Sequence, residues 1–344
     1  MSSYNGALSN LPNGEARTDT RPCRILLMGK SRSGKSSARE TIFNNMSPKQ
    51  TIYLESTARI TKKTYQSVVP IELWECPGNT TIEQLGAPLS EFTSLVYFLD
   101  VQDTYQSIVS TFANLVLQCY PQNPNMYFEL LVHKKEALPE DYQHDLMRII
   151  NDRLGVEVED FFADNGVQLD DVVRIHATSI YDHSLWHAFS LIAQRGIEET
   201  YQLAQCVDAF KSNTAFTKVF VFDVATRLYL AMDSEALDVE DYALAWDYLN
   251  TLRQMFPLYN PKTKIEPNGA DVDLAHGVVR LKSTNSNNET VLAYWQINDL
   301  LGVVALMPAD TYDKSIAAIN FNLIQFREGL QDVLDLLAAL NAES

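Results

Sequence analysis

Short apolar runs alternate with helical patterns over the first two thirds of the chain. Five of these runs are typical of buried strands, and they lie at residues 23–28, 68–74, 94–101, 127–133 and 172–177. Helices are predicted between and after them, at residues 36–45, 103–120, 139–162 and 182–209. Strands that alternate with helices indicate a parallel, doubly wound sheet that helices cover on both faces.

The pattern changes after about residue 211. Strands at 216–222 and 227–232 precede a helix at 237–255, and polar loops are expected at 260–275 and 283–288. The remaining elements are three strands and a final helix, at 277–282, 290–295, 301–306 and 312–340. We therefore predict a disordered tail at 1–21, an α/β domain at 22–211 and a smaller α+β domain at 212–344.

Composition and charge exclude several classes of protein. The chain has 344 residues, of which 46% are hydrophobic and 21% charged, so it can bury a sizeable core. Its net charge of −17 disfavours binding to nucleic acid or to anionic lipid. The cysteines are widely spaced, which suggests neither a zinc site nor a disulfide framework and fits a reduced compartment. No apolar run is long enough to span a bilayer, so direct membrane insertion is not expected.

A phosphate-binding loop is predicted at residues 29–36. The segment GKSRSGKS fits the pattern GxxxxGK[ST], and it follows a predicted strand and opens a predicted helix. Lys35 would reach the β- and γ-phosphates, and the Ser36 hydroxyl would hold Mg²⁺. Loop amides at the helix N-terminus would complete the nucleotide contacts. The predicted phosphate-side residues are Lys30, Ser31, Arg32, Ser33, Gly34, Lys35, Ser36 and Ser37.

Three further segments follow predicted strands, and ligands of doubly wound sheets bind at these carboxyl ends. WECPGN at 74–79 is similar to the DxxG segment of P-loop GTPases, which implies that Glu75 would support Mg²⁺ and the Gly78 amide would contact the γ-phosphate; the alternative is a simple turn. HKKE at 133–136 stands where GTPases place [NT]KxD, which implies that Glu136 would accept hydrogens from the guanine edge; the alternative is an ordinary charge cluster. Residues 178–180 stand where GTPases contact the guanine oxygen through backbone amides. Thr57, which lies between the phosphate-binding loop and the segment at 74–79, is the candidate switch-loop ligand of Mg²⁺.

Four strings resemble the RagC/RagD branch of the Rag GTPases. They are YLEST at 53–57, HK at 133–134, TSIYDHS at 178–184 and FVFDV at 220–224, and the resemblance runs from about residue 23 to the C-terminus. It implies a fungal-like member with a P-loop (Ras-like) GTPase domain followed by a roadblock-like (longin-like) domain. It also implies GTP/GDP and Mg²⁺ as ligands, with His133, Lys134, Glu136, Ser179 and Ile180 on the guanine side.

The resemblance further implies a set of partners. Members of the branch form a heterodimer with a RagA/RagB-type subunit through their C-terminal domains. A scaffold complex holds the pair at the cytoplasmic face of the lysosome or vacuole, where it signals amino-acid sufficiency to the TOR kinase complex. Activating and exchange proteins control the nucleotide.

Departures from the family pattern leave two hypotheses. Glu136 stands where the family normally has Asp, and Asn79 stands where many relatives have the Gln that orients the attacking water. The first hypothesis is a slow Mg²⁺-dependent GTPase with Gly78 and Asn79 as catalytic positions. The second is a nucleotide-bound scaffold subunit with little turnover. An ATP-dependent P-loop enzyme is disfavoured because His133-Lys134 and Thr178-Ser179 form a guanine-type arrangement.

Overall fold

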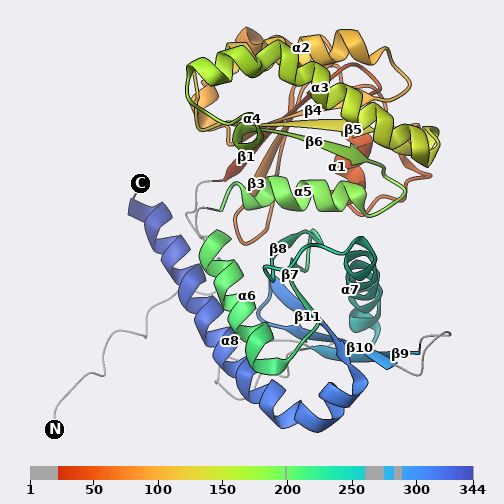
Figure 1. Ribbon diagram of the computed structural model, residues 1–344, viewed down its shortest axis with the longest axis vertical. Helices are drawn as coiled ribbons and strands as arrows, with labels where there is room; N and C mark the ends of the chain where they lie inside the picture. Colours follow the sequence, from red (N-terminus) through yellow and green to blue (C-terminus); the bar gives the residue numbers. More distant parts are fainter. Residues whose placement is uncertain (1–21, 198–199, 260–274, 283–288, 344) are drawn as a thin grey trace.

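The computed structural model describes residues 22–197, 200–259, 275–282 and 289–343. The predicted tail at 1–21, the predicted loop at 283–288 and all but the last residue of the predicted loop at 260–275 lie outside the described residues. Two domains stack along the long axis of the molecule, each built around its own sheet (Figure 1).

The first domain is a six-stranded sheet with the order β2-β3-β1-β4-β5-β6. All neighbours are parallel except β2, which runs antiparallel to β3 at the edge. The five predicted strands are confirmed, and β2 was missed because its sequence TKKTY is polar and largely exposed. The strands are β1 Cys23–Gly29, β2 Thr61–Tyr65, β3 Ile71–Glu75, β4 Ser94–Asp100, β5 Tyr127–His133 and β6 Val173–Thr178.

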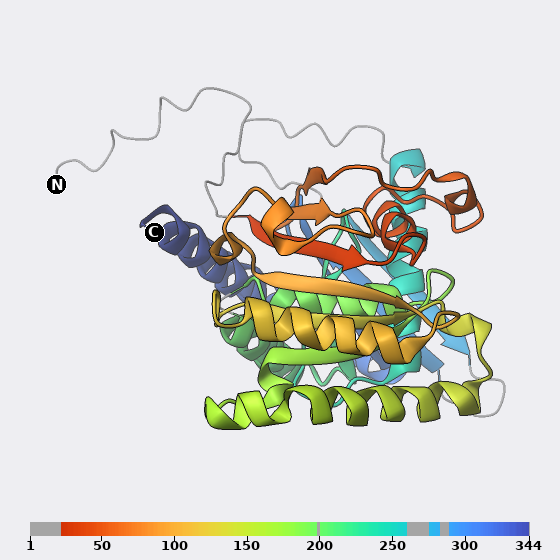
Figure 2. The ribbon, with the colours of Figure 1, turned by 90° about the horizontal axis from the view of Figure 1, so that it is seen from above.

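Helices cover both faces of this sheet. Buried side chains of α1 (Lys35–Phe43) and α5 (Ser184–Gln194) share a core with Ile25 and Leu27 of β1. On the other face, α2 (Tyr105–Cys119) and α3 (Glu140–Asp164) pack together over Leu26 of β1 (Figure 2). A short helix, α4 (Leu169–Val172), precedes β6. The predicted doubly wound α/β fold is therefore confirmed.

The single helix predicted at 182–209 is wrong. The structure has two helices there, α5 and α6 (Thr200–Thr214), and the chain turns between them at Gly196. A Cβ at Gly196 would lie 2.4 Å from Sγ of Cys23, so only glycine fits this close approach to β1. Helix α6 packs on α8 (Ala309–Glu343), β7 (Lys218–Asp223) and β8 (Tyr229–Met232) of the second domain, although the predicted boundary at residue 211 assigned most of it to the first.

The second domain is a five-stranded antiparallel sheet with the order β8-β7-β11-β10-β9. Helices α6 and α8 (Ala309–Glu343) lie on one face and α7 (Val239–Tyr259) on the other (Figure 1). The predicted α+β domain is therefore confirmed. Its strands are β7 Lys218–Asp223, β8 Tyr229–Met232, β9 His276–Lys282, β10 Glu289–Gln296 and β11 Leu301–Pro308.

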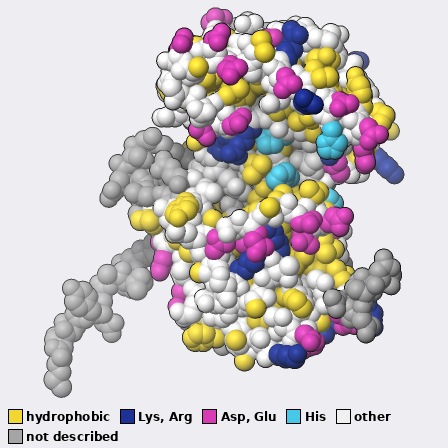
Figure 3. Space-filling model, viewed as in Figure 1, with side chains coloured by type: hydrophobic (Ala, Val, Ile, Leu, Met, Phe, Trp, Pro, Cys, Tyr) yellow, Lys and Arg dark blue, Asp and Glu magenta, His cyan; other side chains and the backbone are white. Residues whose placement is uncertain are grey.

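The two domains are in direct contact through α5 and the end of α1. The rings of Trp186 on α5 and Trp246 on α7 lie 4.8 Å apart, and the buried Arg227 guanidinium lies over both. Arg227 also donates a hydrogen bond of 3.4 Å to the carbonyl of Ile42 on α1. Histidine side chains are visible along this junction on the face in Figure 3, and His183 Nε2 lies 3.0 Å from the Asp247 carboxylate. Among the described residues, no helix has the length and apolar character that crossing a membrane requires.

Candidate nucleotide-binding site

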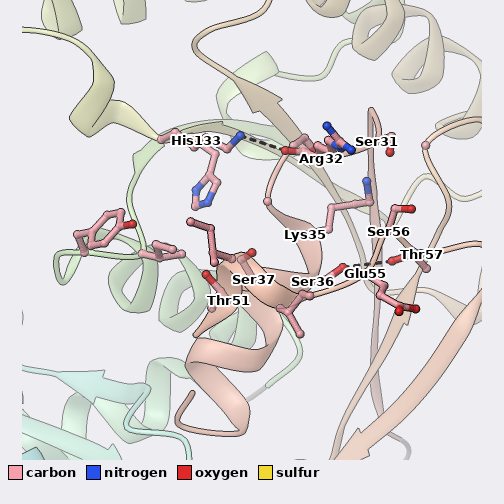
Figure 4. A pocket seen from close by; sticks show the side chains of 18 of the residues that line it. Ser31, Arg32, Lys35, Ser36, Ser37, Thr51, Glu55, Ser56, Thr57 and His133 are labelled. Carbon is pink, nitrogen blue, oxygen red and sulfur yellow. Dashed lines mark hydrogen bonds between the residues drawn. The ribbon is translucent and has the colours of Figure 1, made fainter. Parts of the chain in front are cut away.

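A cavity of about 730 Å³ opens at the carboxyl ends of the parallel strands (Figure 4). The segments singled out in the sequence meet there, since β1, β3, β5 and β6 all end at this edge of the sheet. The predicted residues that line the cavity are Ser31, Arg32, Ser33, Gly34, Lys35, Ser36, Ser37, Thr57, Gly78, His133, Lys134, Glu136 and Ile180.

The phosphate loop is held in shape by its own lysine. Lys35 Nζ donates hydrogen bonds of 2.8 Å to the carbonyls of both Gly29 and Lys30. Burial lowers the pKa of Lys35, and interactions with Glu75 and Cys76 act in the opposite direction. The backbone turns through left-handed conformations at Arg32 (φ 63°) and Gly34 (φ 103°), just before α1 begins. The loop therefore places a cation and the start of a helix at one end of the cavity.

Three oxygen-bearing side chains converge beside this loop. Ser36 Oγ lies 3.1 Å from Thr57 Oγ1 (Figure 4). Both hydroxyls donate to the Glu75 carboxylate. These are the three residues predicted to serve Mg²⁺. Glu75 itself is only 1% exposed and lies behind the cavity lining, where it forms an ion pair with Arg39 of α1.

Gly78 packs directly against the phosphate loop. A Cβ on this residue would lie 2.3 Å from the backbone nitrogen of Ser31, so a larger residue would push the two segments apart. The neighbouring Asn79 is exposed and is not among the cavity-lining residues. Lys30 also points away from the cavity, with Nζ 3.9 Å from the Asp103 carboxylate.

The segment after β5 connects the phosphate loop to the last strand of the sheet. The buried His133 ring packs closely against Gly34. A Cβ added to Gly34 would lie only 2.4 Å from Cδ2 of His133. His133 Nδ1 and Thr178 Oγ1 are hydrogen bonded at 2.9 Å. Burial, and secondarily the Lys134 charge, lower the pKa of His133 to about 4, so the imidazole is neutral at pH 7.

Lys134 connects the same segment to the loop by its ammonium group. Its Nζ donates to the Arg32 carbonyl at 3.0 Å and pairs with the Asp100 carboxylate. The Lys134 backbone is left-handed (φ 63°), which turns the chain toward Glu136 on the exposed rim. The hydrocarbon stem of Lys134 and the carboxylate of Glu136 thus lie opposite the phosphate end of the cavity.

The segment after β6 supplies Ile180 and, unpredicted, Tyr181 to the lining. Ser179 is buried beneath them: its amide donates to Ser184 Oγ at 3.0 Å, and its hydroxyl accepts from the Tyr181 amide at 3.1 Å. Ser179 therefore shapes this turn from below and does not line the cavity.

Sequence reasoning missed most of the segment before Thr57. It contributes Thr51, Ile52, Leu54, Glu55 and Ser56 to the cavity lining. The string at 53–57 was singled out for its threonine and for the family resemblance, but its other residues were not assigned to the site.

Comparisons with known proteins agree with this geometry. Residues 24–249 match the model of the family described as the Gtr1/RagA G protein conserved region. The chain is 30% identical to GTP-binding protein gtr2 of Schizosaccharomyces pombe, over 91% of this chain and 98% of that protein. It is also 30% identical to Ras-related GTP-binding protein C of Homo sapiens, over 92% of this chain and 78% of that protein. GTP-binding protein gtr1 of S. pombe matches at 26% identity, over 68% of this chain and 76% of that protein.

Proposed function

Because the chain belongs to the Gtr1/RagA G protein family, we propose that it is a guanine-nucleotide-binding switch subunit of the RagC/RagD type that hydrolyses GTP slowly. One observation carries the proposal. The phosphate loop, the hydroxyls of Ser36 and Thr57, and the base-side segment at 133–136 all face one cavity.

The cavity suits a nucleoside triphosphate from end to end. Lys35 and the start of α1 offer positive charge and free amides to phosphates. At the other end, the Glu136 carboxylate can accept two hydrogens from the guanine edge, and the stem of Lys134 and Ile180 can pack on the ring. Adenine offers no such pair of donors on that edge, so this arrangement favours guanine.

The residues present also fit Mg²⁺. Hydroxyl and carboxylate oxygens are ligands that this ion prefers, and Ser36, Thr57 and Glu75 bring such oxygens together. Ser36 and Thr57 would bind the ion directly, and Glu75 would act from behind them. When bound, Mg²⁺ would neutralise developing charge on the β- and γ-phosphates. In the part of the chain that the structure describes, no group of three or more His, Cys, Asp or Glu could hold a metal ion, so the nucleotide would supply further ligands.

Slow turnover follows from the residue that would orient the attacking water. Asn79 is shorter than glutamine by one methylene, and its side chain is exposed beside Gly78, outside the cavity lining. An activating protein that presses on this segment would bring the amide into position. The same observation favours the second candidate function, a nucleotide-bound scaffold subunit with little turnover of its own.

The second domain supports a role in pairing. Its sheet ends at β9, whose Val278 and Val279 are 37% and 39% exposed. We propose that this domain pairs with a RagA/RagB-type subunit. Such a pair would be held by a scaffold complex at the lysosomal or vacuolar surface and would signal to the TOR kinase complex.

Overnight incubation with GTP, followed by separation of GTP from GDP, tests the proposal. The purified chain should bind GTP in preference to ATP and convert it slowly to GDP. Binding without any conversion, alone and with an activating protein, would favour the scaffold. Failure to bind guanine nucleotide with Mg²⁺ present would refute both.

A further inference from the structure

A buried ion pair lies directly behind the predicted Mg²⁺ position. Arg39 follows Ser36 by one turn of α1, and its Nη1 contacts the Glu75 carboxylate. The two side chains are 9% and 1% exposed. Arg39 holds oxygen Oε2 of Glu75, whereas the hydroxyls of Ser36 and Thr57 share oxygen Oε1. The guanidinium thus fixes which carboxylate oxygen faces the cavity side.

The arginine is itself held by a second carboxylate. Its Nη2 lies 2.6 Å from Oε1 of Glu40, the next residue on α1. Lys63 of β2 and Asn44 also donate to the Glu40 carboxylate. Burial alone would raise the pKa of Glu40, but these hydrogen bonds lower it to about 2, so Glu40 is charged at pH 7. The network therefore fixes Arg39 from the side opposite Glu75.

A buried carboxylate without a partner is costly, and its field in a poorly solvated site is strong. Arg39 cancels most of the Glu75 charge at the position where a divalent cation would bind. A cation there is attracted less than by a free carboxylate, and phosphate oxygens are repelled less.

We propose that Arg39 is a positioning residue that sets how steeply nucleotide binding depends on Mg²⁺. It orients Glu75 toward Ser36 and Thr57 and limits the preference of the site for metal-bound over metal-free nucleotide. This inference rests on the proposed function, because it concerns the same site.

The measured quantity is the ratio of the GDP dissociation constant in EDTA to that in excess Mg²⁺, obtained with fluorescent GDP and the full-length chain. In Arg39→Gln, the unpaired Glu75 attracts Mg²⁺ and repels bare phosphates, so the ratio should rise by about tenfold. Arg39→Lys keeps the charge and should return the ratio toward the wild-type value. Lys63→Gln is the matched control, since Lys63 contacts Glu40 but not Glu75, and its ratio should stay at the wild-type value.

A double variant separates electrostatic positioning from plain structural support. Arg39→Gln/Glu75→Gln removes both charges and leaves no unpaired carboxylate at position 75, so its ratio should lie below that of Arg39→Gln. Glu75→Gln alone leaves Arg39 paired with Glu40 but keeps its positive charge beside the metal position, so its ratio should fall below that of the double variant. The comparison of Glu75→Gln with the double variant tests the role of Arg39 even if Arg39→Gln does not fold.

Equal ratios in wild type and folded Arg39→Gln, or in Glu75→Gln and the double variant, would overturn the role of Arg39. Absence of GDP binding by the wild-type chain with Mg²⁺ would instead overturn the proposed function.

Discussion

A methyl group added at Gly34 tests whether the contact between the phosphate loop and His133 shapes the cavity. The new Cβ would lie 2.4 Å from Cδ2 and 2.8 Å from Nε2 of His133, whereas nonbonded carbons normally stay ~3.5–4.0 Å apart. Overpacking of this kind costs about 1–3 kcal/mol. The left-handed φ of 103° at Gly34 adds a backbone cost of roughly 1–2 kcal/mol for alanine. If both the overpacking cost and the backbone cost destabilise the conformation that binds GTP, Gly34→Ala weakens GTP binding by at least about thirtyfold.

The His133→Ala background separates the two costs. With the imidazole removed, alanine at Gly34 meets only the backbone cost, so the four proteins of the cycle should show a coupling of about 1–3 kcal/mol. Titration with fluorescent GTP at fixed Mg²⁺ measures it. Gly166→Ala is the matched control, because Gly166 also has a left-handed φ (69°) but nothing within 4 Å of its Cβ. If alanine at Gly34 weakens binding by the same factor with and without the His133 ring, the packing argument is refuted.

Four further predictions follow from the same structure. Lys35→Ala or Ser36→Asn should abolish stable GTP binding, since each removes a contact to phosphate or metal; normal affinity in a titration would contradict the assigned loop. Glu136→Asp should keep guanine binding and Glu136→Ala should lose it, so wild-type affinity in the alanine variant would exclude Glu136 as the base reader. Because the folded-state pKa of Glu40 is depressed from 4.5 to about 2, its contribution to the free energy of unfolding should be present above pH 4.5 and lost as the pH falls toward 2. Urea unfolding of Glu40→Gln should accordingly show a smaller loss over that range than wild type does. Pairing with a RagA-type subunit should survive in Lys35→Ala, and separate elution of the two full-length chains in size exclusion would contradict pairing through the second domain.

Strands buried on both faces could be predicted from sequence because they read as continuous apolar runs. The edge strand β2 could not, since an exposed edge tolerates lysine, and Lys62 is stabilised there by lying 3.4 Å over the Trp74 ring. The break between α5 and α6 was also missed. Helical periodicity continues through it, and the requirement for Gly196 comes from Cys23, a residue of a distant strand. Gly196 was the local signal that could have marked the turn.

The phosphate loop could be predicted because all of its chemistry lies within one short segment of fixed spacing. Contacts between segments could not, and Arg39 illustrates the reason. On the predicted helix at 36–45, an Arg-Glu dipeptide is typical of a solvated face, yet Arg39 and Glu40 are each 8% exposed. Burial of that dipeptide becomes favourable only because β3 brings a third charged group, Glu75, to the same point and β2 brings Lys63. Neither strand is near α1 in sequence, so the partner of each charge depends on the register of the sheet. The electrostatics of the metal side of the site therefore arise at the tertiary level, whereas its phosphate chemistry is local.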